Sequence, residues 1–369
     1  MIRVLLVSPL PPPDGGISKW TRMLVDRGIP GGIQIEVINT NVKRSHFSKT
    51  ARPTPSEMLR NWRILTQVRS AVHSGRFDVM HLNHASLSRN GMFRDYLIGR
   101  IASAGKLPYV VQLHGTLDLA LNRRAIGKMR IKAYRGLFER AAAILPVNTP
   151  TKESVLTLDP SAAERCEIVP HFITSDQIQP RNPDDATPDR PFQIVYAGSL
   201  VMAKGLAELL AIAQRVDDVH LTLIGQAAGK REQRYMEFFQ DPRIAHRVTL
   251  TGHLPNREVL DILMEADVYC LPSHTEGFPM SIMEAMQAGL PVVASNVGAI
   301  PDMVDVPQGG ILCTPRDTDR FIAAIEHLRD FPEERREMGN HNRTQALSKY
   351  DYDDVVRRLA DVYLRAAAR

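Results

Sequence analysis

Short apolar runs alternate with amphipathic or polar stretches along most of the chain. Such runs are typical of strands that are buried on both faces of a parallel sheet. In the first half they predict strands at residues 2–7, 35–38, 79–82, 109–113 and 143–147. In the second half they predict strands at residues 194–197, 221–224, 248–251, 268–271, 292–294 and 310–313. Because helical or polar segments separate the strands of each series, the pattern predicts two doubly wound α/β domains.

One stretch between the two series has no periodicity. Residues 176–191 are rich in proline and aspartate, a composition that is typical of interdomain linkers. We therefore predict an N-terminal domain over residues 1–175, a linker over 176–191 and a C-terminal domain over 192–350. A final helical segment follows over residues 351–369.

The segment 271–295 has the clearest chemical character. It reads LPSHTEGFPMSIMEAMQAGLPVVAS and predicts a strand end, a turn with Glu276, a helix with Glu284 and a second buried strand. Pro279 suits the first helical position and Gly289 suits the C-terminal cap. A helix start attracts phosphate, and nearby carboxylates suit sugar hydroxyls. The segment therefore predicts a nucleotide-sugar site. One alternative is that Glu276 is merely a helix-start charge and Glu284 a solvated helix charge. The other is a glycosidase acid/base pair, which would not need a phosphate-binding helix start.

The residues around this pair of carboxylates are specific. The frame PS-x-x-EGF, followed by E-A-M-x-x-G-x-P-V-V-A-S, resembles the signature of the family-four retaining glycosyltransferases of the GT-B fold. The resemblance implies two facing Rossmann-like domains with an active cleft between them. It implies that Glu276 holds the donor sugar as a catalytic residue and that Glu284 binds the ribose hydroxyls. The backbone of Gly277, Phe278 and Pro279 would face the sugar and the diphosphate.

Two motifs of the first half occupy places that suit a ligand. Gly15 and Gly16 follow the first predicted strand, where they allow close backbone approach at a helix start. The resemblance places this glycine loop near the diphosphate and the acceptor. His114 follows another predicted strand at the carboxyl edge of the sheet, where ligands of such folds bind. The resemblance gives His114 a catalytic role beside the donor hexose.

Residues 195–206 resemble the family loop whose two cations neutralise the diphosphate. Lys204 matches one cation and is the predicted catalytic residue that stabilises leaving-group charge. Ser199 stands where the family has Arg, so either another Arg enters or Ser199 donates a hydrogen bond to a phosphate oxygen. Residues 252–255 resemble the loop that contacts the base, which gives His253 and Leu254 a donor-binding role.

Two further positions depart from the family pattern. Residues 169–172 read VPHF where the family commonly has Pro-Asn-Gly. Asp302 stands where the family commonly has Glu, although Gly298 still allows close backbone approach in that loop.

The sequence predicts no catalytic metal. Two Asp-x-Asp strings, at residues 317–319 and 351–353, precede helical runs, where Asp is a favoured N-cap. The three cysteines, Cys166, Cys270 and Cys313, share no metal-binding spacing and indicate a reducing cytoplasm. We therefore expect no cofactor beyond the nucleotide-sugar co-substrate.

Charge is distributed unevenly. Residues 1–150 carry a net charge of +15 and the remainder −10, which together give the overall +5. Residues 122–140 are the densest basic segment, in which Lys and Arg residues alternate with apolar residues. Such a helix can lie on an anionic membrane; the alternative is a domain helix with its Arg side chains in solvent. No aromatic interleaving supports nucleic-acid binding, and no apolar run is long enough to span a bilayer.

These observations lead to one functional prediction. The chain is expected to be a retaining hexosyltransferase that uses a UDP- or GDP-sugar and acts on a saccharide or lipid-linked saccharide in surface polysaccharide synthesis. The N-terminal domain would bind the acceptor, at the inner face of the plasma membrane, and the C-terminal domain the donor. The resemblance also implies that the final helix packs back on the N-terminal domain. A nucleotide-sugar epimerase of the same fold and a non-catalytic sugar-nucleotide binding subunit are the alternatives.

Overall fold

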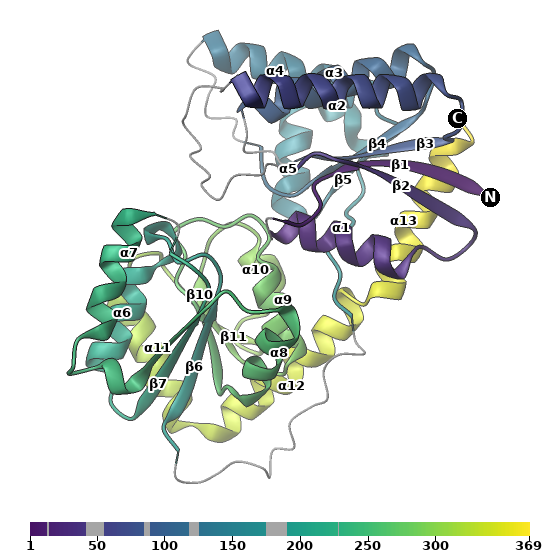
Figure 1. Cartoon of the computed structure of the whole chain (residues 1–369). Coiled ribbons are helices and arrows are strands. Elements are labelled where there is room, and N and C mark those ends of the chain that lie inside the picture. Colours follow the sequence, from purple (N-terminus) through teal and green to yellow (C-terminus); the bar gives the residue numbers. More distant parts are fainter. Residues whose placement is uncertain (13–14, 42–54, 85–88, 118–124, 175–189, 228) are drawn as a thin grey trace. The chain divides into compact units, whose positions relative to one another are not determined.

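The computed structural model of the chain describes residues 1–12, 15–41, 55–84, 89–117, 125–174, 190–227 and 229–369. These residues form two compact units (Figure 1). The N-terminal unit consists of residues 1–172 and 353–369, and the C-terminal unit consists of residues 173–352. Most of the predicted linker, residues 176–189, lies outside the described residues.

The N-terminal unit is built on a parallel sheet. Its strands are β1 (Ile2–Ser8), β2 (Ile33–Asn39), β3 (Val79–His84), β4 (Tyr109–Leu113) and β5 (Ala143–Pro146). Their order across the sheet is β2-β1-β3-β4-β5. The helices are α1 (Gly16–Arg27), α2 (Pro55–His73), α3 (Arg89–Ala104), α4 (Ala125–Phe138), α5 (Thr149–Leu158) and α13 (Tyr352–Ala367), with a 3-10 turn at Pro160–Arg165.

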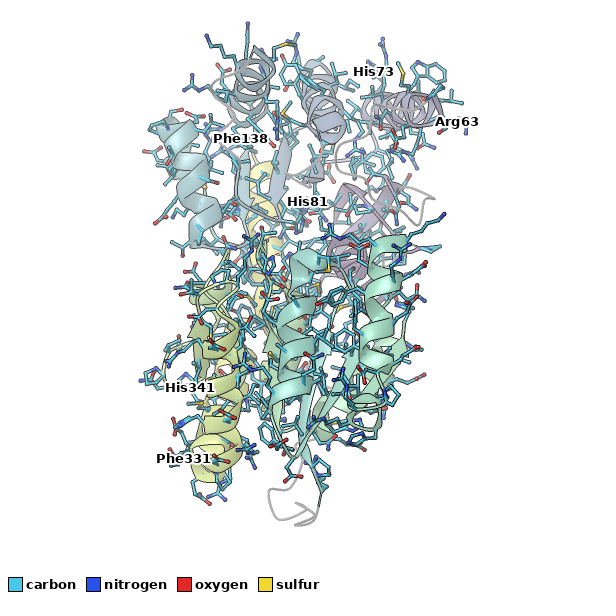
Figure 2. The ribbon with its side chains drawn as sticks, turned by 90° about the vertical axis from the view of Figure 1, so that its left-hand side faces the viewer. Arg63, His73, His81, Phe138, Phe331 and His341 are labelled. Carbon is cyan, nitrogen blue, oxygen red and sulfur yellow. The ribbon has the colours of Figure 1, made fainter. Side chains whose placement is uncertain are left out.

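Alternation along the strands gives this sheet two different faces. Apolar side chains such as Leu5 and Leu82 pack under α2, α3 and α4, which lie side by side over one face (Figure 1). Residues of opposite parity, including His81 and Asn83, point to the face that α1 and α13 cover. His81 lies inside the unit, whereas Arg63 of α2 lies on its outer layer (Figure 2). The polar side chains of the strands are therefore concentrated on the α1 and α13 face.

The C-terminal unit is built on a second parallel sheet. Its strands are β6 (Phe192–Ala197), β7 (Val219–Ile224), β8 (Val248–Gly252), β9 (Val268–Leu271), β10 (Val292–Ser295) and β11 (Gly310–Cys313). Their order is β11-β10-β9-β6-β7-β8, so the direction of winding reverses between β6 and β9. The main helices are α6 (Leu206–Arg215), α7 (Lys230–Met236), α8 (Asn256–Glu265), α9 (Met280–Gln287), α10 (Ile300–Met303), α11 (Thr318–Asp330) and α12 (Pro332–Lys349). Short 3-10 turns lie at Met202–Lys204, Glu237–Gln240 and Ala245–Arg247.

The predicted doubly wound α/β architecture is confirmed in both units, because every predicted strand is present within a residue or two of its expected bounds. One detail of the helix in segment 271–295 differs. Pro279 is the N-cap in an extended conformation, and the helix begins at Met280. Gly289 lies just beyond the helix with a φ of 80°, a left-handed conformation that favours glycine. Of the basic segment, the structure describes the helix Ala125–Phe138, and Arg123 and Arg124 lie outside the described residues.

Candidate active site

The strand order of the C-terminal unit defines a position for a ligand. In open parallel sheets, ligands bind outside the carboxyl ends of the strands, where the winding reverses. In this unit the reversal lies between β6 and β9. The loop after β6 leads to Lys204, and the loop after β9 leads to Glu276. The fold therefore brings these two predicted catalytic residues to one place.

Lys204 and Glu276 form an ion pair at this edge. The Lys204 Nζ lies 2.5 Å from Oε2 of Glu276. The other carboxylate oxygen, Oε1, accepts a hydrogen bond of 2.7 Å from the Ser273 hydroxyl. The Glu276 side chain is only 7% exposed, while that of Lys204 is 29% exposed. Glu276 is thus held at both oxygens, and it fixes a cation that remains accessible from solvent.

Two glycines allow the loops that carry this pair to stack closely. Gly205 has a φ of 82°, and a Cβ there would lie 2.2 Å from the carbonyl oxygen of Pro272. Gly298 has a φ of 59°, and a Cβ there would lie 2.2 Å from the carbonyl oxygen of Glu276. The close approach expected at Gly298 is therefore an approach to the backbone of Glu276. Both positions require glycine because a side chain would push the loops apart.

Glu284 belongs to the same cluster. It lies on α9 and is buried at 8% exposure, so the alternative of a solvated helix charge is wrong for this residue. The hydroxyl of Tyr269 donates to the carbonyl of Ala197, the last residue of β6, at 3.2 Å. Burial raises the pKa of Tyr269, and the carboxylates of Glu276 and Glu284 raise it further. Both carboxylates therefore lie near one phenol at the end of β6.

The residues after Glu276 lead directly into α9. Gly277 accepts a hydrogen bond of 3.1 Å from the backbone N–H of Ala299. The Phe278 ring packs edge-on against Tyr350 at 6.0 Å. Pro279 has no N–H, so the backbone donors of this helix start come from Met280 onward. The donor-facing role of Gly277, Phe278 and Pro279 stays a prediction.

The other predicted donor residues of the C-terminal unit lie at the same edge of its sheet. Ser199 is exposed, and its carbonyl accepts a hydrogen bond of 2.8 Å from the Tyr196 hydroxyl. Gly252 ends β8 with a φ of 72°, followed by the exposed His253 and the partly exposed Leu254. Because β7 separates β8 from β6, this loop lies to one side of the ion pair. The structure pairs Lys204 with Glu276 and places Glu276 and Glu284 near the Tyr269 phenol. The roles of these residues and of Ser199, His253 and Leu254 stay predictions.

A second polar pair supports the site, and sequence reasoning missed it. The Glu208 carboxylate lies 2.9 Å from Nε2 of His274, and Glu208 is 3% exposed. The backbone N–H of His274 donates to the carbonyl of Ala203 at 2.9 Å. The pair therefore joins the start of α6, just after Lys204, to the loop that carries Glu276. In the sequence, Glu208 has only the signature of an acidic residue in a first helical turn.

The predicted glycine loop of the N-terminal unit is described in part, because residues 13–14 lie outside the described residues. Gly15 is the N-cap of α1 with an extended φ of −170°, and a Cβ there would meet only the Ser18 hydroxyl at 3.7 Å. Gly15 and Gly16 are both exposed. The unit's own packing therefore does not require glycine at Gly15. Its predicted role toward a diphosphate stays a prediction.

His114 lies just after β4, partly exposed, with both ring nitrogens engaged. Its Nε2 lies 2.9 Å from Oδ1 of Asn83, and its Nδ1 lies 2.8 Å from Nε2 of His171. Trp20 of α1 packs edge-on against the His114 ring at 6.1 Å. His171 belongs to the VPHF segment that departs from the family pattern. The pattern of apolar and polar residues in the sequence does not indicate that His171 contacts His114. The role of His114 toward the hexose stays a prediction.

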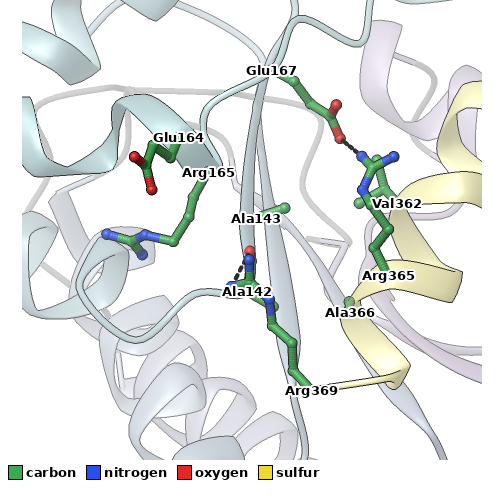
Figure 3. A pocket seen from close by; sticks show the side chains of 9 residues that line it. All are labelled: Ala142, Ala143, Glu164, Arg165, Glu167, Val362, Arg365, Ala366 and Arg369. Carbon is green, nitrogen blue, oxygen red and sulfur yellow. Dashed lines mark hydrogen bonds and ion pairs between the residues drawn. The ribbon is translucent and has the colours of Figure 1, made fainter.

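A small hollow between β5 and α13 lies elsewhere in this unit (Figure 3). It is lined by Ala143, the first residue of β5, and therefore lies opposite the edge that carries His114. The Arg165 guanidinium donates to the carbonyls of Phe138 and Ala141. Arg365 pairs with Glu167 at its rim. These charges already serve the fold, so we do not assign the hollow to the reaction.

The described part of the chain contains no helix that is long and apolar enough to cross a membrane. In the same residues, no cluster of three or more His, Cys, Asp and Glu side chains has the geometry to hold a metal. Asp317 caps α11 and accepts a hydrogen bond of 3.2 Å from the backbone of Arg320, as predicted for that Asp-x-Asp string. The three cysteines are buried as free thiols.

Comparison with family models covers most of the chain. The model described as Glycosyltransferase Family 4 matches residues 14–177. The model described as Glycosyl transferases group 1 matches residues 179–345. Both matches include predicted site residues.

The chain is also similar to curated and solved proteins. It is 32% identical to the glycogen synthase of Mycobacterium tuberculosis over 180 residues, which cover 48% of this chain and 43% of that protein. The chain spans about half the length of the curated relatives that it matches above 30% identity.

Two solved structures share the fold over nearly their full length. Sucrose-phosphate synthase from Thermosynechococcus elongatus matches with a TM-score of 0.78 and 19% identity, over 100% of both chains. Anabaena HepE in complex with UDP-glucose matches with a TM-score of 0.73 and 16% identity, over 98% of this chain and 99% of that chain. The shared architecture is the GT-B fold.

Proposed function

Because this chain belongs to glycosyltransferase family four, we propose that it transfers a hexosyl unit from a nucleotide diphosphate sugar to an acceptor hydroxyl with retention at the anomeric carbon. The observation that carries the proposal is the cluster of Lys204, Glu276 and Glu284 at the carboxyl ends of β6 and β9. A cation paired with one buried carboxylate, and a second buried carboxylate on the helix that follows, suit a ligand that combines phosphate with hydroxyl groups. The geometry supports a donor site within the C-terminal unit.

Each charged group has a separate task in the proposed reaction. The bond between the anomeric carbon and the diphosphate oxygen breaks, and the diphosphate leaves with the electron pair. Lys204 and the backbone N–H groups at the start of α9 stabilise that negative charge. Glu276 holds the hexose, and Glu284 accepts hydrogen bonds from the ribose hydroxyls. The acceptor oxygen attacks from the face that the diphosphate leaves, and the acceptor proton passes to a departing phosphate oxygen. We assign no covalent nucleophile to the protein.

The donor is a UDP- or GDP-sugar, with UDP-glucose as the first compound to test. HepE, which shares the fold, was determined in complex with UDP-glucose. A thermal-shift panel of UDP- and GDP-sugars tests this part of the proposal. We expect either the UDP-sugars or the GDP-sugars to raise the melting temperature, and the donor that binds most tightly to raise it most. The proposal would be contradicted if no nucleotide sugar stabilised the protein.

Product analysis separates transfer from its alternatives. With donor and an acceptor saccharide, the proposal requires a new glycoside and a free nucleoside diphosphate. An epimerised sugar nucleotide formed from donor alone would instead identify an epimerase. Tight donor binding with neither product from any acceptor would identify a binding subunit.

The acceptor side of the proposal is a lipid-linked saccharide at an anionic membrane surface, as part of surface polysaccharide synthesis. Support comes from the outer helix layer of the N-terminal unit. There, Met58 and Trp62 of α2 are 62% and 61% exposed, and Met129 of α4 is 59% exposed. Lys128 and Lys132 are exposed on α4 as well. Exposed apolar side chains beside cations suit the interface of an anionic bilayer.

Vesicle co-sedimentation tests the membrane part. The double variant Leu59→Ser and Trp62→Ser should no longer co-sediment with anionic vesicles, because both side chains are at least half exposed on α2 and are proposed to enter the membrane interface. Leu364→Ser is the matched control, since Leu364 is 52% exposed on α13 of the same unit. Lys128→Gln with Lys132→Gln should weaken binding most at low salt, where charge is least screened. Unchanged co-sedimentation of both double variants would contradict the membrane part and leave the transfer reaction untouched.

A further inference from the structure

Two arginines of the N-terminal unit lie near each other on neighbouring helices. Arg60 is in the second turn of α2 and Arg94 is in the second turn of α3, and these helices lie side by side over one face of the sheet (Figure 1). α3 follows the end of β3 and α2 leads to the start of β3, so both helices begin at the carboxyl edge of the sheet. Because helical side chains lean toward the helix N-terminus, this edge is within reach of both arginines.

Arg94 has an anion of its own. Its Nε donates to Oδ1 of Asp95 at 2.7 Å, and its Nη2 lies 2.7 Å from the same oxygen. The Asp95 side chain is 1% exposed and that of Arg94 is 12% exposed. This contact holds one side of the Arg94 guanidinium and leaves Nη1 outside it.

Arg60 lacks such a contact. Its Nε is completely buried and has no hydrogen-bond partner in the part of the chain that the structure describes. Burial lowers the pKa of Arg60, and the positive charge of Arg94 lowers it further. Glu57, in the preceding turn, raises that pKa by less than Arg94 lowers it. A buried donor on a cation beside a second cation is costly unless an anion compensates.

The neighbouring helix carries a third arginine in the corresponding turn. Arg130 lies in the second turn of α4, which packs against α3. Its Nε is also buried and finds no hydrogen-bond partner among the described residues. Three helices that start at the carboxyl edge therefore each contribute a cation, and two of these cations have a buried donor to offer.

The chemistry of this cluster fits a phosphate group. A carboxylate has two oxygens and matches the fork of one guanidinium, as Asp95 shows with Arg94. A phosphate has more oxygens and can accept hydrogen bonds from guanidinium groups that approach from two helices. Met58, Leu59 and Trp62 are exposed around Arg60 on α2. Hydrocarbon beside phosphate is the chemistry at the head of a lipid-linked saccharide.

We propose that Arg60 and Arg94 bind a phosphate group of the acceptor, which makes the acceptor a phosphate-bearing lipid-linked saccharide and excludes a neutral glycan. This inference rests on the proposed function for its place in the reaction. The phosphate anchors the acceptor, and no bond to its phosphorus forms or breaks. Arg60 and Arg94 therefore determine acceptor specificity, whereas the diphosphate of the donor is left to Lys204.

Binding of octyl phosphate tests the site without any transfer. Calorimetry with UDP and GDP both in excess keeps the donor site occupied. Arg60→Gln should bind octyl phosphate roughly ten- to a hundredfold more weakly than wild type, because charge-assisted hydrogen bonds are lost. Arg63→Gln is the matched control, since it removes the same charge from an exposed position on the same helix (Figure 2), and it should bind as wild type does.

Transfer to soluble acceptors shows whether the phosphate belongs to the acceptor or to a phospholipid headgroup. Each saccharide is offered as an octyl glycoside and as the matching octyl glycosyl phosphate, without vesicles. Wild type and Arg63→Gln should prefer the phosphate form in kcat/KM by roughly tenfold or more. Arg60→Gln should lose this preference and should keep the wild-type rate on the octyl glycoside. Arg60→Lys, which keeps the charge without the fork, should recover part of the preference.

Arg94 requires a gentler substitution, because Arg94→Gln would leave the buried Asp95 without its cation. Arg94→Lys keeps that charge and should weaken octyl phosphate binding by about fivefold, since one ammonium replaces the fork. Melting temperatures check that each variant is folded.

Three results separate the possible failures. Equal binding of octyl phosphate by wild type and Arg60→Gln, or equal losses in Arg60→Gln and Arg63→Gln, would overturn the site. Loss of octyl phosphate binding in Arg60→Gln, with no preference of wild type for phosphate-bearing acceptors, would identify a phospholipid headgroup and overturn the acceptor assignment. Absence of hexosyl transfer by wild type would instead overturn the proposed function, and the calorimetry is independent of that outcome.

Discussion

The two units treat the polar side chains at the carboxyl ends of their strands in opposite ways. In the C-terminal unit, the edge carries a charged pair, Lys204 and Glu276, with the Lys204 side chain still 29% exposed. In the N-terminal unit, the edge carries Asn83 and His171, which are almost completely buried and are linked through His114.

The difference follows from the cost of burying charge. Neutral hydrogen-bonding groups can be buried once they are paired, whereas a buried ion needs a partner and strong compensation. Groups that meet a charged diphosphate therefore have to stay at an accessible edge, as proposed for Lys204. Groups without charge can be buried, as His171 is. One unit thus presents an accessible ion pair, whereas the other presents buried side chains without charge.

The largest expected effect is at the charged edge. Glu276→Gln removes the anion that holds Lys204, while the amide oxygen of Gln can still accept the hydrogen bond from the Ser273 hydroxyl. We expect kcat/KM for the best donor to fall roughly 10²- to 10³-fold, as for loss of a preorganised electrostatic group. Glu258→Gln, at an exposed position on α8, is the control and should be active. Near-wild-type turnover of Glu276→Gln would remove this residue from the reaction.

A smaller effect is expected for nucleotide binding. Glu284→Ala removes a buried carboxylate and, with it, the proposed charge-assisted hydrogen bond to ribose, worth on the order of 1.5 to 3 kcal/mol. Calorimetry should show the affinity for the free nucleoside diphosphate falling by roughly ten- to a hundredfold. Glu337→Ala, an exposed glutamate on α12, is the matched control. Equal affinity of Glu284→Ala and wild type would exclude the ribose contact.

The neutral edge predicts an acid-sensitive N-terminal unit. Burial lowers the pKa of His81 and His171 from 6.5 to about 3. Between these values the unfolded chain binds protons that the folded unit excludes, so stability is full above about pH 6.5 and is lost as pH falls. The loss should be on the order of 1 kcal/mol per pH unit for each residue.

Tryptophan fluorescence isolates this effect, because Trp20 and Trp62 are the two tryptophans of the chain and both belong to the N-terminal unit. Urea unfolding measured at descending pH gives the free energy of unfolding as a function of pH. Its slope should be smaller for His171→Asn than for wild type. The exposed His253→Gln should leave the slope unchanged. A wild-type slope in His171→Asn would mean that His171 is not held neutral.

The smallest expected effect is that of a chelator. Because Lys204 and helix-start N–H groups are proposed to carry the diphosphate charge, EDTA should leave the transfer rate unchanged. If EDTA abolished activity and Mg²⁺ or Mn²⁺ restored it, a metal ion would carry the diphosphate charge instead. The proposed contrast between the two units would then not hold.

Local signals in the sequence were enough for the strands. Apolar runs set the bounds of Tyr109–Leu113, Val268–Leu271 and Gly310–Cys313 as the structure has them. The sequence predicts Pro279 at the first helical position, whereas in the structure Pro279 is the N-cap. Proline suits both positions, so the sequence does not distinguish them. The motifs around Glu276 and Lys204 indicated each residue separately.

The connections between distant residues had no local signal. Nothing in the sequence near Glu208 indicates that it is buried against His274, 66 residues further on. His114 and His171 are 57 residues apart, and neither lies in a pattern that names the other. The sequence predicts close backbone approach at Gly298, and the structure shows that the group approached is the carbonyl of Glu276. Such contacts arise only when parallel strands bring their loops to one edge.

The α13 helix also orders events during synthesis on the ribosome. It covers the face of the N-terminal sheet through apolar residues such as Leu359, and its Tyr363 hydroxyl meets His81. Residues 353–369 are made after the whole of the C-terminal unit, a delay on the order of ten seconds at typical elongation rates. The nascent N-terminal sheet therefore waits with one face incompletely covered, and the unit translated first is the last to be completed.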